Sequence, residues 1–171
     1  MKETNLLKQW WILLLLVGLS AGCSNEVDSR EPAIEPSELN QTLTNSLLEN
    51  FGYRNEVQED AIQLVEFDES TGKLKLIAFV YSFEEESYEE FKADILDSCA
   101  NVLQDVKRQQ EVQEVELTVQ TSVDLEAKSL ENAAIFKIIF ERSNLTNTNF
   151  HELDPLKLSQ KATFYFEAPI Q

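Results

Sequence analysis

The sequence has few of the residues on which catalytic and metal sites depend. Its 171 residues include one histidine, His151, and two cysteines, Cys23 and Cys99. A Ser or Cys nucleophile activated by histidine needs that base beside it, and zinc takes roughly three or four protein ligands. No G-x-S-x-G motif precedes His151, and His151 and Cys99 fall on different expected elements. The sequence therefore favours neither a catalytic triad nor a zinc site, and we interpret His151 as an ordinary surface side chain.

Glycine and basic residues are also scarce. The chain has four glycines, and only Gly52 and Gly72 lie beyond the N-terminal segment, so no glycine cluster is available to cradle a phosphate. The 14 Lys and Arg are outnumbered by 31 Asp and Glu, which gives a formal net charge of −17. Such a charge opposes binding to nucleic acid and to anionic lipid headgroups. We expect no cofactor and no nucleic-acid partner, and we interpret the acidity as a source of solubility.

Only one long hydrophobic run occurs, from Trp10 to Leu19. It is about half of the ~20 apolar residues that a membrane-spanning helix needs, which favours the core of a signal peptide over an uncleaved membrane helix. Lys2 and Lys8 precede the run, and Ser20-Ala21-Gly22-Cys23 follows it. The N-terminal segment therefore predicts export from the cytoplasm.

These residues resemble the signal of bacterial lipoproteins, in which small residues lead to a cysteine that becomes lipidated. The resemblance covers residues 1–23 only. It implies removal of residues 1–22, lipid groups such as diacylglycerol and palmitate on Cys23, and attachment to the extracytoplasmic face of the bacterial cell membrane. Two acyl chains suffice for stable anchoring. Ser20 departs from the pattern, which usually has Leu there. Ser20-Ala21-Gly22 also fits ordinary signal cleavage, which would leave Cys23 a free thiol able to pair with Cys99.

Beyond the signal, the chain divides into a tether and one domain. Residues 23–36 carry the cysteine and a flexible linker with Pro32, Pro36, several charged residues and little apolar content. Residues 37–171 are expected to form a single acidic domain that is long enough to bury a core. Loss of Lys2, Lys8 and Glu3 with the signal changes the formal charge from −17 to −18.

Apolar spacing predicts two helices and four strands. Leu39, Leu43, Leu47 and Phe51 recur every four residues and predict a helix over residues 37–51, with Ser37 as its N-cap and Gly52 as its stop. A longer helix is expected over 84–109, with Ser82 and Glu85 as a capping box and Cys99 on its buried stripe. Alternation predicts strands over 61–67, 73–83, 112–123 and 133–142, of which 73–83 is apolar on both faces and therefore expected to be central.

This order predicts an α+β domain: an antiparallel sheet of two hairpins with helices on one face, in the order α-β-β-α-β-β, followed by an irregular C-terminal tail. In the tail, residues 155–160 suggest a short helix and residues 162–166 either a last strand or a packed extension. The tetrapeptide at 56–59 recurs at 111–114. A duplicated α-β-β unit is therefore one hypothesis for the origin of the domain.

Two clusters outside the core bear on function. The acidic run from Glu84 to Glu90 has neither the spacing nor the glycine of a calcium loop, and we interpret it as a solvated helix start. Phe164-Tyr165-Phe166 is the candidate interaction surface. We expect a non-enzymatic lipoprotein that binds another protein or supports an envelope complex, with the membrane, through Cys23, as its other partner. A small-ligand or cation-binding lipoprotein is the alternative. A carboxylate-based hydrolase is a third, because many acidic pairs are available and no spacing selects one.

Overall fold

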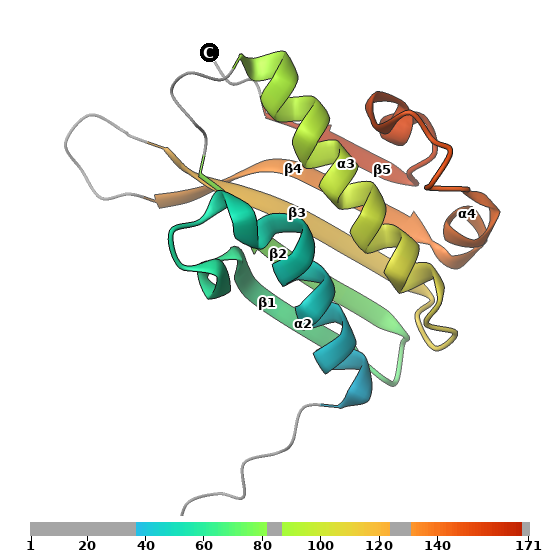
Figure 1. Ribbon diagram of the computed structural model, residues 1–171. Helices are drawn as coiled ribbons and strands as arrows, with labels where there is room; N and C mark the ends of the chain where they lie inside the picture. Colours follow the sequence, from blue (N-terminus) through green and yellow to red (C-terminus); the bar gives the residue numbers. More distant parts are fainter. Residues whose placement is uncertain (1–36, 82–86, 124–130, 169–171) are drawn as a thin grey trace, which may run out of the picture. The chain divides into compact units, whose positions relative to one another are not determined.

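The computed structural model describes residues 37–81, 87–123 and 131–168, which form one α+β unit (Figure 1). Its elements are, in chain order, α2 (Glu38–Phe51), η1 (Gly52–Arg54), η2 (Gln58–Ala61), β1 (Ile62–Asp68), β2 (Lys73–Phe79), α3 (Tyr88–Lys107), β3 (Glu114–Val123), β4 (Glu131–Glu141), α4 (Arg142–Asn147), η3 (Pro155–Gln160) and β5 (Phe164–Glu167). The expected helices and strands are present, while α4 was not predicted.

The five strands form one mixed sheet in the order β1-β2-β3-β4-β5. The two expected hairpins, β1–β2 and β3–β4, are confirmed as antiparallel pairs, and β5 adds to β4 in the same sense. The expectation of a purely antiparallel sheet was wrong, because β2 and β3 are parallel. The cause is the 20-residue helix α3, which follows β2 in the chain, runs back along one face of the sheet and leads into β3 (Figure 1). A crossover helix of this kind returns the chain to the end of the sheet at which β2 began, so the next strand runs in the same direction.

Both long helices lie on one face of the sheet, as expected, and the core fills the space between them and the strands (Figure 1). The predicted stripe of α2 is buried, and so is that of α3, apart from the half-buried Tyr88. Cys99 is a fully buried member of this core, which confirms its place on the stripe. The strands contribute the side chains that alternate toward the helices, among them Leu76, Leu117, Phe136 and Phe140.

The helix starts follow capping rules, but not always at the expected residue. Ser37 caps α2, and its hydroxyl accepts a hydrogen bond from the backbone N–H of Asn40 at 3.3 Å. Helix α3 begins at Tyr88 rather than at residue 84, because its capping box is made by Ser87 and Glu90. Ser82 and Glu85, the pair expected to form that box, lie outside the described residues. Both pairs have the Ser-x-x-Glu spacing, so the pattern alone does not choose between them.

The two glycines of the domain behave differently. Gly72 takes a φ of 70°, a left-handed conformation that the turn between β1 and β2 requires and that glycine adopts without strain. A Cβ on Gly72 would stand 2.6 Å from the Cγ of Gln113, in the loop that enters β3. Gly52 does not end α2 in the left-handed conformation; its φ of −60° carries the chain on into η1. The expected stop at Gly52 is therefore a change of helix type.

The C-terminal tail is more regular than expected. The short helix over 155–160 is confirmed as the 3₁₀ helix η3, and residues 164–167 are confirmed as a strand, β5. The unpredicted helix α4 begins at Arg142, whose guanidinium donates to the carbonyls of Lys107 at 3.3 Å and Gln109 at 2.9 Å. These carbonyls lie at the C-terminal end of α3, where a positive charge is favourable. The tail is thus tied to the end of α3.

The strand directions argue against a duplicated α-β-β unit. In both hairpins the first strand lies on the same side of the second, yet the parallel pairing of β2 with β3 makes the hairpins point in opposite directions. Rotating the second hairpin by a half-turn in the plane of the sheet would give its strands the directions of the first hairpin. The same rotation would put β3 on the other side of β4, so the order of the strands would no longer agree. With both helices on one face, the two units therefore cannot be superposed. The shared tetrapeptide also differs in structure, because its last residue lies in η2 in the first copy (Glu59) and begins β3 in the second (Glu114).

Candidate binding surface

The sheet presents one face that no helix of the described residues covers, here called the open face. Strand register places in one row across it the side chains that alternate away from α2 and α3. One such row consists of Leu64, Ile77, Thr118, Lys137 and Phe166. The next row consists of Glu66, Lys75, Glu116, Ile139 and Phe164. Each row thus combines apolar and charged groups, and the two phenylalanines stand side by side at the β5 end.

The predicted triplet on β5 is divided between the two faces of the sheet. Phe164 and Phe166 lie on the open face, where they are 48% and 44% exposed. Tyr165 points the other way, is half-buried, and has its ring 6.5 Å from that of Phe136. Alternation along a strand makes this division unavoidable. Phe164 and Phe166 are therefore available to a partner, whereas Tyr165 belongs to the packing of the domain.

A carboxylate fixes β5 to α3 on the helix side. Glu167 accepts hydrogen bonds from the hydroxyl of Tyr88 at 2.6 Å, from Nζ of Lys92 at 2.7 Å and from the hydroxyl of Tyr165 at 2.9 Å. Burial alone would raise the pKa of Glu167, but the bonds from Lys92 and the two tyrosines outweigh it and hold that pKa below its usual range. Burial and the same carboxylate raise the pKa of Tyr88. This network holds in place the strand that carries Phe164 and Phe166.

Charges on the open face are paired in part and acidic in excess. Lys73 bonds Glu114 at 3.0 Å, and Lys137 bonds Glu116 at 2.9 Å, each pair spanning neighbouring strands. The face also carries Lys75, against the further acids Glu66, Asp68 and Glu141. Ile77 and Ile139 are half-exposed between these charges. The open face thus has apolar side chains interspersed with charged ones, and acids outnumber bases among the charges.

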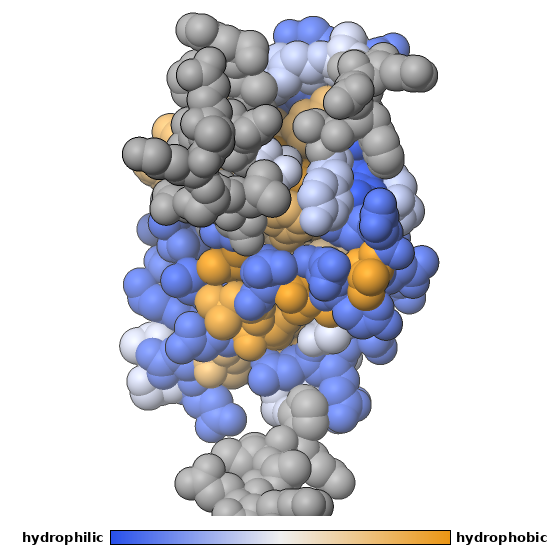
Figure 2. All heavy atoms as spheres, turned by 90° about the vertical axis from the view of Figure 1, so that its left-hand side faces the viewer, coloured by the Kyte–Doolittle hydropathy of each residue, from blue (hydrophilic) through white to orange (hydrophobic). Residues whose placement is uncertain are grey.

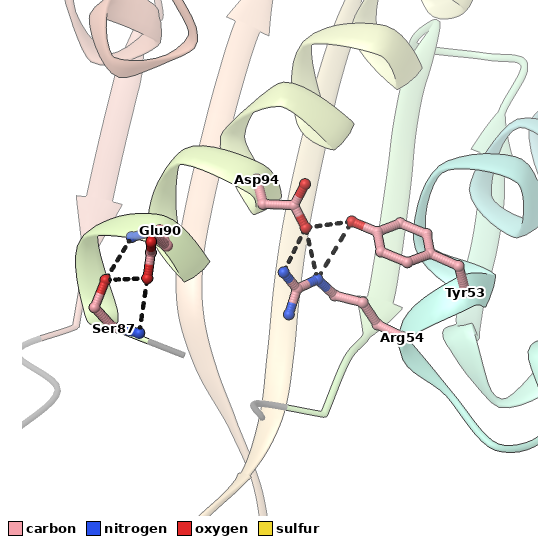
Figure 3. Close-up of polar contacts among 5 residues, drawn as sticks. All are labelled: Tyr53, Arg54, Ser87, Glu90 and Asp94. Carbon is pink, nitrogen blue, oxygen red and sulfur yellow. Dashed lines mark hydrogen bonds and ion pairs between the residues drawn. The ribbon is translucent and has the colours of Figure 1, made fainter. Parts of the chain in front are cut away.

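A second polar cluster lies between η1 and α3 (Figure 3). The side chain of Arg54 is 3% exposed, its Nε donates to Asp94 at 2.9 Å, and its Nη2 also bonds that carboxylate. The hydroxyl of Tyr53 donates to the same oxygen. Burial alone would raise the pKa of Asp94, but bonds from Tyr53 and Arg54 hold it below its usual range. The Arg54 guanidinium also lies 5.1 Å from the centre of the Phe91 ring. The cluster is a charge pair held against the core.

Beside this cluster is a surface hollow of about 450 Å³, lined by Tyr53, Arg54, Asn55, Glu56 and Tyr81. The amide nitrogen of Asn55 donates to the carbonyls of Phe51 at 3.1 Å and Phe79 at 3.0 Å, which ties η1 to β2. The amide oxygen of Asn55 is buried and has no partner among the described residues. Since that oxygen is out of reach of solvent, the groups offered to a ligand are the exposed side chains of Tyr53, Glu56 and Tyr81.

The other residues singled out from the sequence are not brought together. Cys23 lies outside the described residues. Cys99 is enclosed in the core, and burial raises the pKa of its thiol. His151 is exposed after α4. In the part of the chain that the structure describes, no three His, Cys, Asp or Glu side chains gather as metal ligands would. Asp94 and Glu167, the two partly buried carboxylates with lowered pKa, are held ionised, so neither is suited to act as a general acid at neutral pH.

No helix among the described residues combines the length and the hydrophobicity needed to cross a bilayer. Comparison with known proteins adds no relative: no family model, no curated protein and no solved structure matches the chain.

Proposed function

We propose that the chain is a lipid-anchored, extracytoplasmic domain that binds another protein through the open face of its sheet. The observation that carries this proposal is the pair Phe164 and Phe166, which are 48% and 44% exposed on a sheet face that no helix of the described residues covers. Aromatic side chains are enriched at protein interfaces, where each buries a large area at low cost in conformational entropy. An exposed aromatic pair beside half-exposed Ile139 is therefore suited to form the centre of a contact.

Charge indicates the chemistry of the partner. The acidic excess on the open face, and the formal net charge of −17 for the chain, favour a partner surface that combines apolar side chains with basic ones at its rim. A second copy of the domain is disfavoured, because its open face would bring the same acidic excess against the first. The occupant that we propose is accordingly a different protein with a basic rim.

The anchor is supported by the sequence resemblance and by Cys99. The residues that resemble a lipoprotein signal end at Cys23, the proposed lipid attachment site. Pairing of Cys23 with Cys99 would require a thiol that the core encloses completely, so lipidation accounts better for Cys23. The linker at residues 24–36 reaches at most ~40 Å when extended, at about 3.3 Å per residue. Its length suits a domain held near a membrane whose anionic headgroups repel it.

The test is capture of partners from detergent-solubilised membranes by the lipidated protein. We expect the double variant Phe164→Ser/Phe166→Ser to lose proteins that the unaltered chain retains. Leu156→Ser is the matched control, because Leu156 on η3 is 48% exposed and lies off the open face. A set of captured proteins unchanged by the double variant, or an equal loss in the control, would refute the proposal.

Small-ligand binding is the second candidate function, and the hollow beside η1 is the observation that favours it. Tyr53 and Tyr81 are 53% and 43% exposed there, and Glu56 adds a carboxylate. Aromatic rings and a carboxylate suit an organic cation. A thermal-shift screen that includes choline and calcium tests this role, with Tyr81→Ala as the variant expected to abolish any shift. No shift with any compound would remove the candidate.

A further inference from the structure

The two edges of the sheet differ in what they offer to another strand. β1 forms one edge with seven residues, whereas β5 forms the other with four. An edge strand leaves every second pair of its backbone N–H and C=O groups without a partner in the sheet, and such a row can bind an extended chain. Short edge strands are a common protection against this, and β5 has that protection. β1 does not, so it is the longer free edge of the described sheet.

The segment that contains β1 carries charge of one sign, and the nearest basic residues are Lys73 and Lys75 of β2, which stand opposite Asp68 and Glu66. The segment from Asn55 to Gly72, which contains β1, has no lysine or arginine, and its acidic residues are Glu56, Glu59, Asp60, Glu66, Asp68 and Glu69. Asp60 and Glu66 are exposed, one just before the strand and one within it. Like charges at an edge repel a second copy of the same edge. The same charges attract a strand that carries lysine or arginine.

Apolar side chains accompany these acids. Leu64 is partly buried on the open face, Ile62 and Val65 are partly buried against the core, and Val57, just before η2, is 53% exposed. Figure 2 shows the left-hand side of Figure 1, where hydrophobic residues gather in one area between hydrophilic ones. An extended segment laid along β1 would thus find apolar contacts as well as carboxylates.

We propose that the β1 edge binds an extended, lysine- or arginine-containing segment of a partner protein, which joins the sheet as an additional strand. This inference rests on the proposed protein-binding function and names a second contact on the partner. Main-chain hydrogen bonds to β1 supply the alignment, and the acidic residues at the edge select for basic side chains. A second copy of the domain is disfavoured as occupant, because the acids of its own β1 would repel those of the first.

The probe is a synthetic peptide in which lysine alternates with valine, added to the lipidated full chain in detergent. Hydrogen exchange measured by mass spectrometry should show slower exchange within Ile62–Asp68, and not within β5. A peptide of the same length that alternates glutamate with valine is the control for charge and should give no protection. Equal protection by both peptides, protection at β5, or dimerisation of the chain in place of peptide binding would overturn the proposal.

Charge at the edge is tested by neutralisation. Asp60→Asn/Glu66→Gln should weaken binding of the lysine peptide by about two- to fivefold for each charge removed, the range of exposed ion pairs. The control Glu49→Gln/Glu152→Gln removes two exposed acids on other elements and should leave binding unchanged. The variant Phe164→Ser/Phe166→Ser should also bind the peptide normally. If this variant binds the peptide normally and still captures the same membrane proteins as the unaltered chain, the open-face proposal fails alone. If the variant loses the captured proteins but the lysine peptide does not slow hydrogen exchange in β1 of the unaltered chain, the edge proposal fails alone.

Discussion

Arg54 and Asp94, 40 residues apart in the chain, form a charge pair in which the arginine side chain is 3% exposed and the aspartate side chain 44%. The burial is one-sided, so the two partners are not equivalent. Removing the aspartate takes two hydrogen bonds from a buried guanidinium, whereas water can still solvate the aspartate when the arginine is gone. The stability of the junction between η1 and α3 therefore depends on the carboxylate.

Asp94→Ala should destabilise the domain by about 1.5–3 kcal/mol, the range for hydrogen bonds that involve charged groups. Urea denaturation measures the difference. Asp97→Ala is the matched control, because Asp97 is an exposed aspartate on the same helix and its change should cost far less. An equal effect of the two substitutions would contradict the role given to Asp94.

Acid should weaken the attachment of β5 to α3. The pKa of Glu167 is lowered in the folded protein, so its ionised form contributes stability above the pKa of the unfolded chain. That contribution is lost as the pH falls through the lowered pKa, in the range below about 4.3. Glu167→Gln should therefore flatten the dependence of unfolding free energy on pH in this acid range. Asp94 adds to the same dependence, so the slope should fall without vanishing.

Cys99 should be inert in the folded protein. Its side chain is fully buried and burial raises the pKa of its thiol, so the reactive thiolate is not formed at neutral pH. A thiol reagent such as 5,5′-dithiobis(2-nitrobenzoate) should label it in urea but not in buffer. Rapid labelling of the native Cys23→Ala protein, which retains only Cys99, would show that the core is open there.

Cys23→Ala should release the protein from the membrane or leave it unprocessed, because the variant has no sulfur to lipidate. Fractionation and mass spectrometry of the purified chain measure both outcomes. Cys99→Ala is the control and should remain in the membrane fraction with the lipid mass attached. Membrane attachment of Cys23→Ala after normal cleavage would contradict lipidation at this residue.

Gly72→Ala should destabilise the domain by at least about 1–2 kcal/mol, the cost of a left-handed conformation for a residue with a Cβ. The added carbon would also stand 2.6 Å from Gln113 and 2.9 Å from the carbonyl oxygen of Glu111. Gly52→Ala is the matched control, since its φ is −60° and its closest contact is 3.3 Å. A smaller effect at Gly72 than at Gly52 would show that the turn before β2 adapts to the change.

Local sequence patterns predicted most helices and strands. The direction in which strands pair, and the contacts between distant residues, depend on long-range pairing that such patterns do not show. The stripe through Leu43 and Leu47 and the position of Cys99 follow from helical spacing, which the sequence displays directly. The parallel pairing of β2 with β3 depends on where α3 returns the chain, and no pattern within either strand shows it. The pair Arg54–Asp94 has no signal in the sequence, because neither residue belongs to a motif.

The candidate surface was predicted in part. The aromatic content of residues 164–166 indicated a place of interest, but alternation on β5 removes Tyr165 from it. Ile77 and Ile139 share a face with Phe164 and Phe166 only through the register of the four strands β2 to β5, which depends on pairings between segments far apart in the chain. The start of α3 shows a different difficulty. A Ser-x-x-Glu capping box was expected there, but at Ser82 and Glu85, whereas the box that caps α3 lies five residues later, at Ser87 and Glu90.

The parallel contact between β2 and β3 also bears on how the domain folds. Lys73 and Glu114, which pair at the start of the two strands, are 41 residues apart, whereas the two hairpins join neighbouring segments. Closing so long a loop lowers the conformational entropy of the chain before the contacts between β2 and β3 offset that loss. We therefore expect the two hairpins to form early during folding. The parallel pairing of β2 with β3 at the centre of the sheet should form late, after α3 has packed on the sheet.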